Sequence, residues 1–321
     1  MRFKGFFIIG FLCFLVLPTR EILAQRVDDP DVRMQWYQDF SYASGVPWYE
    51  IAAVDQFERN IFSFREECHF DYETISICIT DEVWSGPENP RSYDSDEYSA
   101  SLFGGIAKDG DGDGIADIHN EQDVMYTMVE YLRSFNDFEG ALISYYQDEK
   151  SVQIIKEIAS LFEHYETITL DSRSFPVAIH YNYSYQDNYG AARGWGGRRS
   201  HEGIDVFAGY STPVLSTAYG VIEVVGWNKF GGYRIGIRDI YNTYQYYAHL
   251  HGYEGDLKEG DIVEPGQVIG YVGSTGYGPE GTSGKFPPHL HFGLYKYDGR
   301  IEWAFNPYPH LNRWERESKK R

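Results

Sequence analysis

The sequence is poor in cysteine and in positive charge, and both shortages exclude classes of protein. Only three cysteines occur in 321 residues, and neither Cys68 nor Cys78 is spaced as a zinc-binding pair with another cysteine. A zinc site built on thiolates is therefore not expected. Lysine and arginine total 28 against 48 aspartates and glutamates, a formal net charge of −20, and there is no long basic run. This balance argues against a nucleic-acid partner, because proteins that bind nucleic acid carry a positive footprint.

The N-terminal apolar run is also short for a membrane span. It extends from Phe6 to Leu17, after Arg2 and Lys4, whereas a spanning helix needs about 20 residues. A cleavage point after Ala24 is a partial match to the small-x-small pattern. We predict a signal peptide over residues 1–24 and an exported protein. The alternative is an uncleaved anchor, in which case this segment makes the membrane contact.

The two cysteines after the signal segment are Cys68 and Cys78. Because an exported chain meets an oxidising environment, we predict a disulfide that closes this short loop. The alternative is that both are separate small apolar side chains.

Length and composition indicate a soluble globular protein with two cores, since 42% of the 321 residues are hydrophobic. Between residues 29 and 170 the apolar spacing predicts a mainly helical domain. Val46–Glu58 has a proline near the start of a helix, and Val124–Phe135 and Val152–Phe162 show similar spacing.

The pattern changes after a lead-in segment at residues 171–199, in which Phe175–Val177 is expected to start the second core. Short alternating runs separated by glycine turns predict strands at Gly220–Val225, Tyr233–Arg238, Thr243–Leu250, Asp261–Val263 and Gln267–Val272. A charged tail is expected at residues 311–321. The fold class is therefore α+β, with a helical domain followed by a mainly antiparallel β domain at residues 200–310.

Two pairs of polar residues in the β domain are predicted to share a face. His201 and Asp205 are four residues apart, and Gly203 between them argues against a helix. On an extended chain both would point the same way. His289 and His291 are expected to project from one side of a strand. The apolar residues that alternate with this second pair, Leu290, Phe292 and Leu294, should pack on the other side.

Together with His249, these residues are a candidate zinc site. A catalytic zinc takes three nitrogen or oxygen ligands, keeps one position for water, and works with acid or base groups close by. Zn²⁺ held by two neutral histidines and one carboxylate keeps a net positive charge. This charge lowers the pKa of bound water to about 7 and polarises a carbonyl.

The ordered motifs His-x-x-x-Asp, Tyr-x-His-Leu and His-x-His resemble those of the M23 (LytM or lysostaphin-type) metallopeptidases, which cut peptidoglycan peptides. The resemblance spans about residues 175–310 and implies a β peptidase domain with one zinc ion. It implies that His201, Asp205 and His291 are the zinc ligands. His249 and His289 would be the pair that activates water and steadies the oxyanion.

Across the whole chain the sequence is most similar to one branch of that family, the LytH-like L-Ala–D-Glu endopeptidases of spore-forming bacteria. This resemblance implies that peptidoglycan is the partner and that the protein works in the cell wall or spore envelope. A different class of function is a non-catalytic envelope scaffold with the same fold. The complete set of five residues argues against the scaffold.

The helical domain more faintly resembles the lysozyme-like domains of lytic transglycosylases. In that family a helix led by proline ends in the catalytic glutamate, which would be Glu58 here. Two departures weaken an expectation of glycan cleavage. Arg59 stands where a small serine usually follows, and Ser101–Gly105 replaces the usual Gly-x-x-Gln-Phe. The resemblance therefore favours a degenerate domain retained for binding or positioning, with glycan cleavage at Glu58 as an alternative.

Two further groups are candidate binding residues. Asp109, Asp111, Asp113 and Asp117 occupy oxygen-ligand positions of an EF-hand-like calcium loop, although its twelfth position is Asn120 and lacks the bidentate glutamate. A plain series of Asp-Gly turns is the alternative.

Arg198 and Arg199 approach the candidate zinc site along the chain. Arginine forms bidentate pairs with carboxylates, and a stem peptide offers several of these groups. We expect these two arginines to bind substrate, with surface charge as the alternative.

Overall fold

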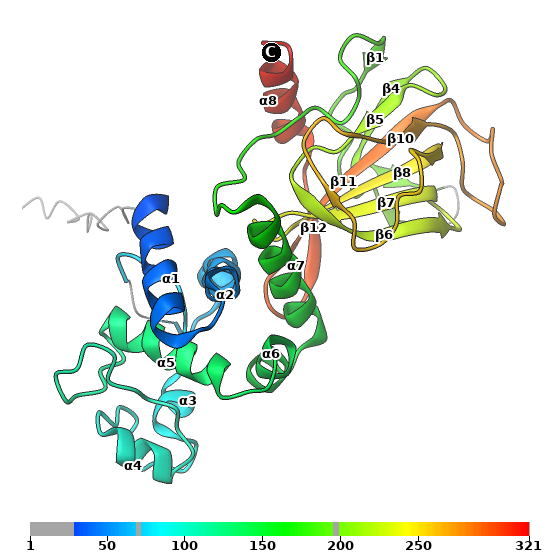
Figure 1. Cartoon of the computed structure of the whole chain (residues 1–321). Coiled ribbons are helices and arrows are strands. Elements are labelled where there is room, and N and C mark those ends of the chain that lie inside the picture. The colour runs from blue at the N-terminus through cyan, green and yellow to red at the C-terminus, as the bar shows by residue number, and fades with distance from the viewer. Residues whose placement is uncertain (1–28, 69–71, 195–198, 321) are drawn as a thin grey trace, which may run out of the picture.

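The computed structural model describes residues 29–68, 72–194 and 199–320, so the predicted signal segment lies outside the described residues. Most helices come first along the chain, the strands follow, and one further helix ends the described residues (Figure 1). Within the described residues, no helix is both long and apolar enough to cross a lipid bilayer.

The helical part contains seven α-helices and one 3₁₀ helix among the described residues. They are α1 (Pro30–Ser44), α2 (Trp48–Ile61), η1 (Phe62–Phe64), α3 (Asp81–Ser85), α4 (Glu97–Leu102), α5 (Glu121–Arg133), α6 (Phe138–Tyr146) and α7 (Glu149–Tyr165). All but α2 and η1 begin after an Asp, Asn or Thr whose side chain accepts a hydrogen bond from a backbone N–H of the first turn. These caps satisfy donors that have no partner within the helix.

Helix α2 is the centre of the first core. It follows Pro47, as predicted, and packs against α1 and α7. Its apolar residues Ile51, Val54 and Phe57 are fully buried. The predicted disulfide between Cys68 and Cys78 is present.

The β part is one antiparallel sheet with the strand order β1-β4-β11-β8-β7-β6-β9. Its path runs through β1 (Tyr183–Ser184), β4 (Ile204–Ala208), β11 (His289–Tyr297), β8 (Thr243–Tyr253), β7 (Gly232–Arg238), β6 (Gly220–Asn228) and β9 (Ile262–Val263). Strand β10 (Val268–Val272) pairs with β5 (Pro213–Leu215) and β8, and β12 (Glu302–Phe305) pairs with β11. A separate small hairpin joins β2 (Ala192–Arg193) and β3 (Arg199–Ser200). All five strands predicted above are present, within a few residues at their ends.

The C-terminal residues differ from the expected charged tail. Residues 308–318 form helix α8 (Tyr308–Ser318), which lies against the β part (Figure 1). Leu311 and Trp314 are three positions apart on one face of α8, and both are buried in the second core. The charged residues on the other faces conceal this apolar pair when composition alone is considered.

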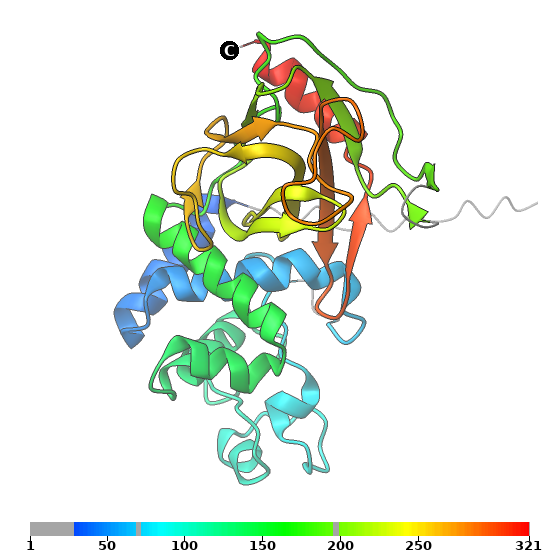
Figure 2. The same cartoon turned by 90° about the vertical axis from the view of Figure 1, so that its right-hand side faces the viewer.

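The two parts are joined by packing as well as by the chain. Val221, Ile240 and Tyr297 of the β part are buried in the core of the helical part. The β11–β12 hairpin reaches the helices (Figure 2). There the rings of Trp303 and Phe64 meet edge to face, with centroids 5.2 Å apart.

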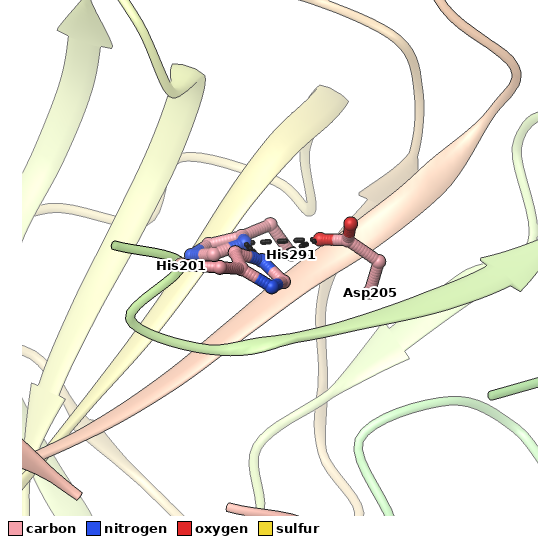
Figure 3. Close-up of side chains that lie close together, drawn as sticks. All are labelled: His201, Asp205 and His291. Carbon is pink, nitrogen blue, oxygen red and sulfur yellow. Dashed lines mark hydrogen bonds and ion pairs between the residues drawn. The ribbon is translucent and has the colours of Figure 1, made fainter. Parts of the chain in front are cut away.

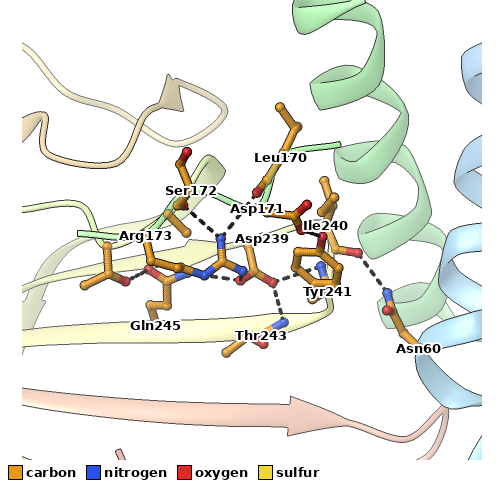
Figure 4. A network of polar contacts seen from close by, with 12 residues as sticks. Asn60, Leu170, Asp171, Ser172, Arg173, Asp239, Ile240, Tyr241, Thr243 and Gln245 are labelled. Atoms are coloured by element: carbon orange, nitrogen blue, oxygen red, sulfur yellow. Dashed lines mark hydrogen bonds and ion pairs between the residues drawn. The ribbon is translucent and has the colours of Figure 1, made fainter. Parts of the chain in front are cut away.

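A polar network lies at the same boundary (Figure 4). The Asn60 side chain on α2 donates to the carbonyl of Ile240 at 2.9 Å. In the lead-in, Arg173 pairs with Asp239 at 2.9 Å, and the Tyr241 hydroxyl donates to Asp171. Because side-chain contacts and core packing both cross the boundary, the helical part has a defined position relative to the sheet.

Candidate metal centre

Three ligand-type atoms meet on the surface of the sheet (Figure 3). His201 Nε2 lies 3.0 Å from Asp205 Oδ1 and 2.9 Å from His291 Nδ1. The remaining side of this triangle, from His291 Nδ1 to Asp205 Oδ1, is 3.1 Å. The three residues predicted to be zinc ligands therefore converge.

The strand order brings these residues together from distant parts of the chain. Strand β11 lies between β4 and β8, and its register places His291 opposite Asp205 on one side and Ala248 on the other. His249, the next residue on β8, thus lies beside His291. As predicted, Leu290, Phe292 and Leu294 of β11 are fully buried in the core on the other face.

The chain around His201 differs from the extended strand that we expected, because β4 starts only at Ile204. His201 instead lies on the segment that passes close to β11 before β4 begins. This close approach requires Gly203, since a Cβ there would lie 2.6 Å from the carbonyl oxygen of Phe292 and 2.7 Å from the His291 ring. The glycine thus serves close approach of two segments as well as excluding a helix.

The triangle fits a small tetrahedral cation. Zinc with ligands about 2.0–2.2 Å away at tetrahedral angles holds them roughly 3.3 to 3.6 Å apart, so the 2.9–3.1 Å sides seen here need open by only a few tenths of an ångström. The His201 Nδ1 lies 2.9 Å from the carbonyl oxygen of Asn188, which accepts only, so that nitrogen carries the proton. Nε2 of His201 therefore directs a lone pair toward the triangle. Two imidazoles and a carboxylate are one of the donor sets found in catalytic zinc sites.

The pKa of Asp205 suits this role. Burial opposes ionisation, but hydrogen bonds to His201 and His291 outweigh it and hold the pKa well below its usual range. Burial lowers the pKa of His291. An ionised carboxylate and a neutral imidazole are the states in which these residues bind a metal.

His249 and His289 flank the triangle. Their ring centroids lie 4.8 Å apart, and His289 Nε2 is 3.7 Å from Asp205 Oδ1. Each Nδ1 is held by a backbone carbonyl at 2.8 Å, that of Thr275 for His249 and that of Pro287 for His289. A carbonyl accepts only, so both Nδ1 atoms carry protons and each Nε2 is the atom available for proton transfer.

His249 has a left-handed backbone, with φ of 63°. The pairing of β7 with β8 shifts register at this level, and the His249 N–H donates to the Gly231 carbonyl at 2.7 Å. Such positions are rare outside glycine and cluster at functional sites. Burial, followed by the nearby His289 and His291, lowers the pKa of His249 well below its usual value, so its imidazole is neutral.

Aromatic side chains surround this pair of histidines. Phe286 lies 4.6 Å from His249 and 5.0 Å from His289, and Tyr277 stacks on His249 at 6.1 Å. Both aromatic residues belong to the glycine- and proline-rich segment that follows β10. This segment therefore forms a wall beside the metal triangle.

Glu58, the candidate glycan acid, is fully buried. Its carboxylate pairs with Arg65 at 2.9 Å and accepts from the Tyr146 hydroxyl at 2.8 Å. Burial raises its pKa to about 7. Arg59 pairs with Asp55 at 3.1 Å, so this departure from the transglycosylase pattern is explained by an ion pair within α2.

The acidic loop adopts a different grouping from the one we expected. Asp109 and Asp111 gather with Asp123 of α5, whereas Asp113 and Asp117 are not in this group. Asp123 accepts hydrogen bonds from the backbone of Gly110, Asp111 and Asp117 at 2.8 to 3.1 Å. Calcium binding here stays a prediction.

Of the candidate substrate residues, Arg198 lies outside the described residues, and Arg199 is placed by its backbone in β3. Their proposed role stays a prediction.

Some residues that hold the site together carry little signal in the sequence. Asn188 contacts both His201 and Asp205, and Thr275 holds His249. Asp123 joins the acidic loop. Their signals were weak: Asn188 lies 13 residues before His201, and the carbonyl of Thr275 is a group that every residue has.

Comparison with known proteins agrees with this geometry. The model of peptidase family M23 matches residues 199–303, which include all five histidine and aspartate positions. The L-Ala–D-Glu endopeptidase of Bacillus subtilis (strain 168) is 52% identical over 298 residues, which are 91% of this chain and 91% of that protein. The resemblance to the L-Ala–D-Glu endopeptidases, which the sequence shows across the whole chain, is confirmed.

Solved structures of related peptidases also match. The catalytic domain of the antimicrobial peptidase lysostaphin from Staphylococcus simulans is 35% identical, with a TM-score of 0.33, and the match covers 41% of this chain and 92% of that one. A zinc containing peptidase from Vibrio cholerae is 25% identical, with a TM-score of 0.34, over 42% of this chain and 39% of that one. Because the B. subtilis enzyme is 52% identical over 91% of this chain and the family model matches residues 199–303, the chain belongs to peptidase family M23, a family of zinc metallopeptidases.

Proposed function

We propose that this protein is a zinc endopeptidase that hydrolyses the L-Ala–D-Glu bond in peptidoglycan stem peptides, outside the cytoplasm, in cell wall or spore cortex remodelling. The observation that carries the proposal is the convergence of His201, Asp205 and His291 beside the anchored rings of His249 and His289. The bond is inferred from the B. subtilis relative, which is similar over nearly its whole length.

We propose His201 Nε2, Asp205 Oδ1 and His291 Nδ1 as the ligand atoms. Zinc held by these atoms would polarise the scissile carbonyl and would lower the pKa of bound water to about 7. Nε2 of one of the two rings, His249 or His289, accepts the proton of the attacking water. Nε2 of the other, when protonated, donates a hydrogen bond to the developing oxyanion. The carbonyls that hold each Nδ1 keep both rings oriented for these roles.

The aromatic wall supports the chemistry by excluding water. Phe286 contacts both rings, and the ring of Phe207 lies tilted against His289 with centroids 5.2 Å apart. Polar interactions are stronger in such an environment than in bulk water. A peptide lying between these aromatic groups would place its carbonyl next to the metal triangle.

Digestion of purified peptidoglycan by the full chain tests the proposal. We expect mass spectrometry of the fragments to show new D-Glu amino termini, and we expect none with the His291→Ala variant. Cleavage of another peptide bond would refute the proposed specificity. Anhydro-sugars would indicate glycan cleavage at Glu58. The absence of any product from zinc-loaded parent protein would indicate a non-catalytic scaffold.

For the helical part, we propose a degenerate lysozyme-like domain over residues 29–170 that positions the peptidase part on its substrate. The complete burial of Glu58 and its ion pair with Arg65 favour a structural role over glycan cleavage. A general acid must reach the leaving oxygen of its substrate. The proposed boundaries leave residues 171–199 as the lead-in and 200–310 as the peptidase domain, with 311–321 following it.

A further inference from the structure

The lead-in segment from Tyr185 to Tyr189 is held on one side by the C-terminal end of the β part. The Tyr185 hydroxyl lies 2.6 Å from Glu315 and 2.9 Å from Asn312 of α8. The Tyr189 hydroxyl donates to the carbonyl of Ala304 at 2.8 Å. Tyr185 thus binds α8, and Tyr189, four positions later, binds β12.

The residue between these anchors confirms the pattern. Asp187 accepts from the Asn306 side chain at 3.1 and 3.3 Å. Side chains at positions 185, 187 and 189 therefore face the same side, as expected of an extended chain. Their partners all follow residue 303, where the match to the family model ends.

Asn188 contacts the candidate metal ligands instead. Its carbonyl oxygen lies 2.9 Å from His201 Nδ1. Its side-chain amide donates to Asp205 Oδ2 and accepts from the Asp205 backbone N–H, each at 3.4 Å. One residue therefore holds the non-liganding nitrogen of His201 and the non-liganding oxygen of Asp205.

The backbone beside Asn188 reinforces these contacts. The Gly190 N–H donates to the His201 carbonyl at 2.8 Å, and the His201 N–H donates to the Ala191 carbonyl at 3.0 Å. His201 lies outside a regular strand, so the sheet alone does not set its position. The neighbouring lead-in does so.

We propose that Asn188 is a positioning residue for the metal centre, which orients the His201 imidazole and the Asp205 carboxylate while β12 and α8 hold the lead-in in place. The inference rests on the proposed ligand set. Partners of this kind fix the tautomer and orientation of ligands, and their loss typically costs about 10- to 100-fold in metal affinity or activity. The Asn188 contacts to Asp205 are long, so we expect about a 10-fold loss.

Zinc affinity of the full chain tests this role, measured by competition with a chromogenic chelator. Asn188→Ala removes the side-chain amide and keeps the carbonyl that faces His201. We expect zinc affinity to fall about 10-fold and the visible absorption spectrum of the Co²⁺-loaded protein to change. Gln186→Ala is the matched control, because Gln186 is an exposed neighbour in the same segment. We expect parental affinity and spectrum for this control.

A second variant keeps the test decisive if Asn188→Ala does not fold. Tyr185→Phe removes the hydroxyl that faces Glu315 and retains the ring packed against Phe175. We expect a loss of zinc affinity of about threefold.

Zinc affinity within twofold of the parent in whichever variant folds would overturn the inference, even if the melting temperature of the metal-free protein falls. Failure of the parent protein to bind zinc would instead overturn the proposed function.

Discussion

The imidazole rings of His249 and His289 lie 4.8 Å apart and nearly edge to face, and each Nδ1 is held by a backbone carbonyl at 2.8 Å. The two residues reach this arrangement from β8 and from the first residue of β11. Equivalent anchoring leaves two equivalent Nε2 atoms beside the metal triangle. A reaction in which one group accepts a proton and another stabilises negative charge needs two such oriented groups.

Removing one of these rings should separate turnover from metal binding. We expect His289→Ala to retain one zinc per chain and to lose about 10²- to 10⁴-fold in kcat, the usual contribution of a general acid or base. His201→Ala should lose both zinc and activity, since its Nε2 is a proposed ligand. Zinc content by atomic emission and peptide hydrolysis rates check both variants. Metal loss in the first variant with metal retention in the second would reverse the assignments.

Gly203 should tolerate no side chain. A Cβ there would lie 2.6 Å from the Phe292 carbonyl oxygen and 2.7 Å from the His291 ring. We expect Gly203→Ala to lower the free energy of unfolding by about 1 to 3 kcal/mol, as overpacking does, and to weaken zinc binding. Gly209→Ala is the matched control, because its nearest neighbouring atom is 3.6 Å away. Urea unfolding measures the free energy of unfolding, and zinc titration measures the zinc affinity. Equal values for the two variants would contradict the close approach of the Gly203 segment to β11.

The boundary between the two parts should weaken as pH rises. Burial raises the pKa of Glu157 on α7 to about 8, helped by the charge of Glu223 on β6, which Arg238 and Lys150 keep ionised. The folded state therefore holds a proton that the unfolded chain releases near its ordinary value of 4.5. This contribution to stability is fully present below about pH 4.5 and is lost as pH rises to about 8.

Replacing Glu157 with a neutral isostere should remove this pH dependence. We expect Glu157→Gln to match the parent near pH 4.5 and to melt at a higher temperature than the parent at pH 8.5. Glu58 also has a raised pKa, of about 7, and it is retained in both proteins, so the difference between them reports Glu157. The exposed Glu280→Gln is the control. Parallel melting curves across this pH range would refute the proton held at Glu157.

Calcium binding at the acidic loop is tested by equilibrium dialysis. The structure gathers Asp109 and Asp111 with Asp123, and the loop lacks a bidentate glutamate at its twelfth position. We expect weak uptake, in the millimolar range, that is lost in Asp111→Asn. If the parent protein takes up no calcium at millimolar concentration, the loop is a plain series of Asp-Gly turns and the calcium prediction is wrong.

The arginines before His201 are expected to affect substrate binding more than catalysis. Changing Arg198 and Arg199 together to alanine should raise KM and leave zinc content intact, because guanidinium groups pair with substrate carboxylates. Steady-state kinetics on a stem peptide, beside zinc analysis, check this expectation. Unchanged kinetics would end the proposal.

Local pattern was sufficient for much of this molecule. The alternation of polar and apolar residues between glycine turns predicts the strands of the β part. A proline followed by apolar residues at helical spacing predicts helix α2. Histidine and aspartate in three ordered motifs were enough to indicate zinc chemistry. Within each strand, helix or motif, these features depend on residues a few positions apart, and that range is what periodicity reports.

Tertiary structure decided how the site is supported. Because β11 lies between β4 and β8, His291 is opposite Asp205. A register shift between β7 and β8 orients the His249 side chain toward the metal triangle. Asn188 is placed beside the metal ligands because its neighbour Tyr185 binds helix α8, more than 100 residues later in the chain. The buried residues of that helix, Leu311 and Trp314, are surrounded by charged residues in the sequence. The sequence by itself determined which chemical groups were available. Their orientation was determined by contacts between distant segments, and local spacing carries no record of such contacts.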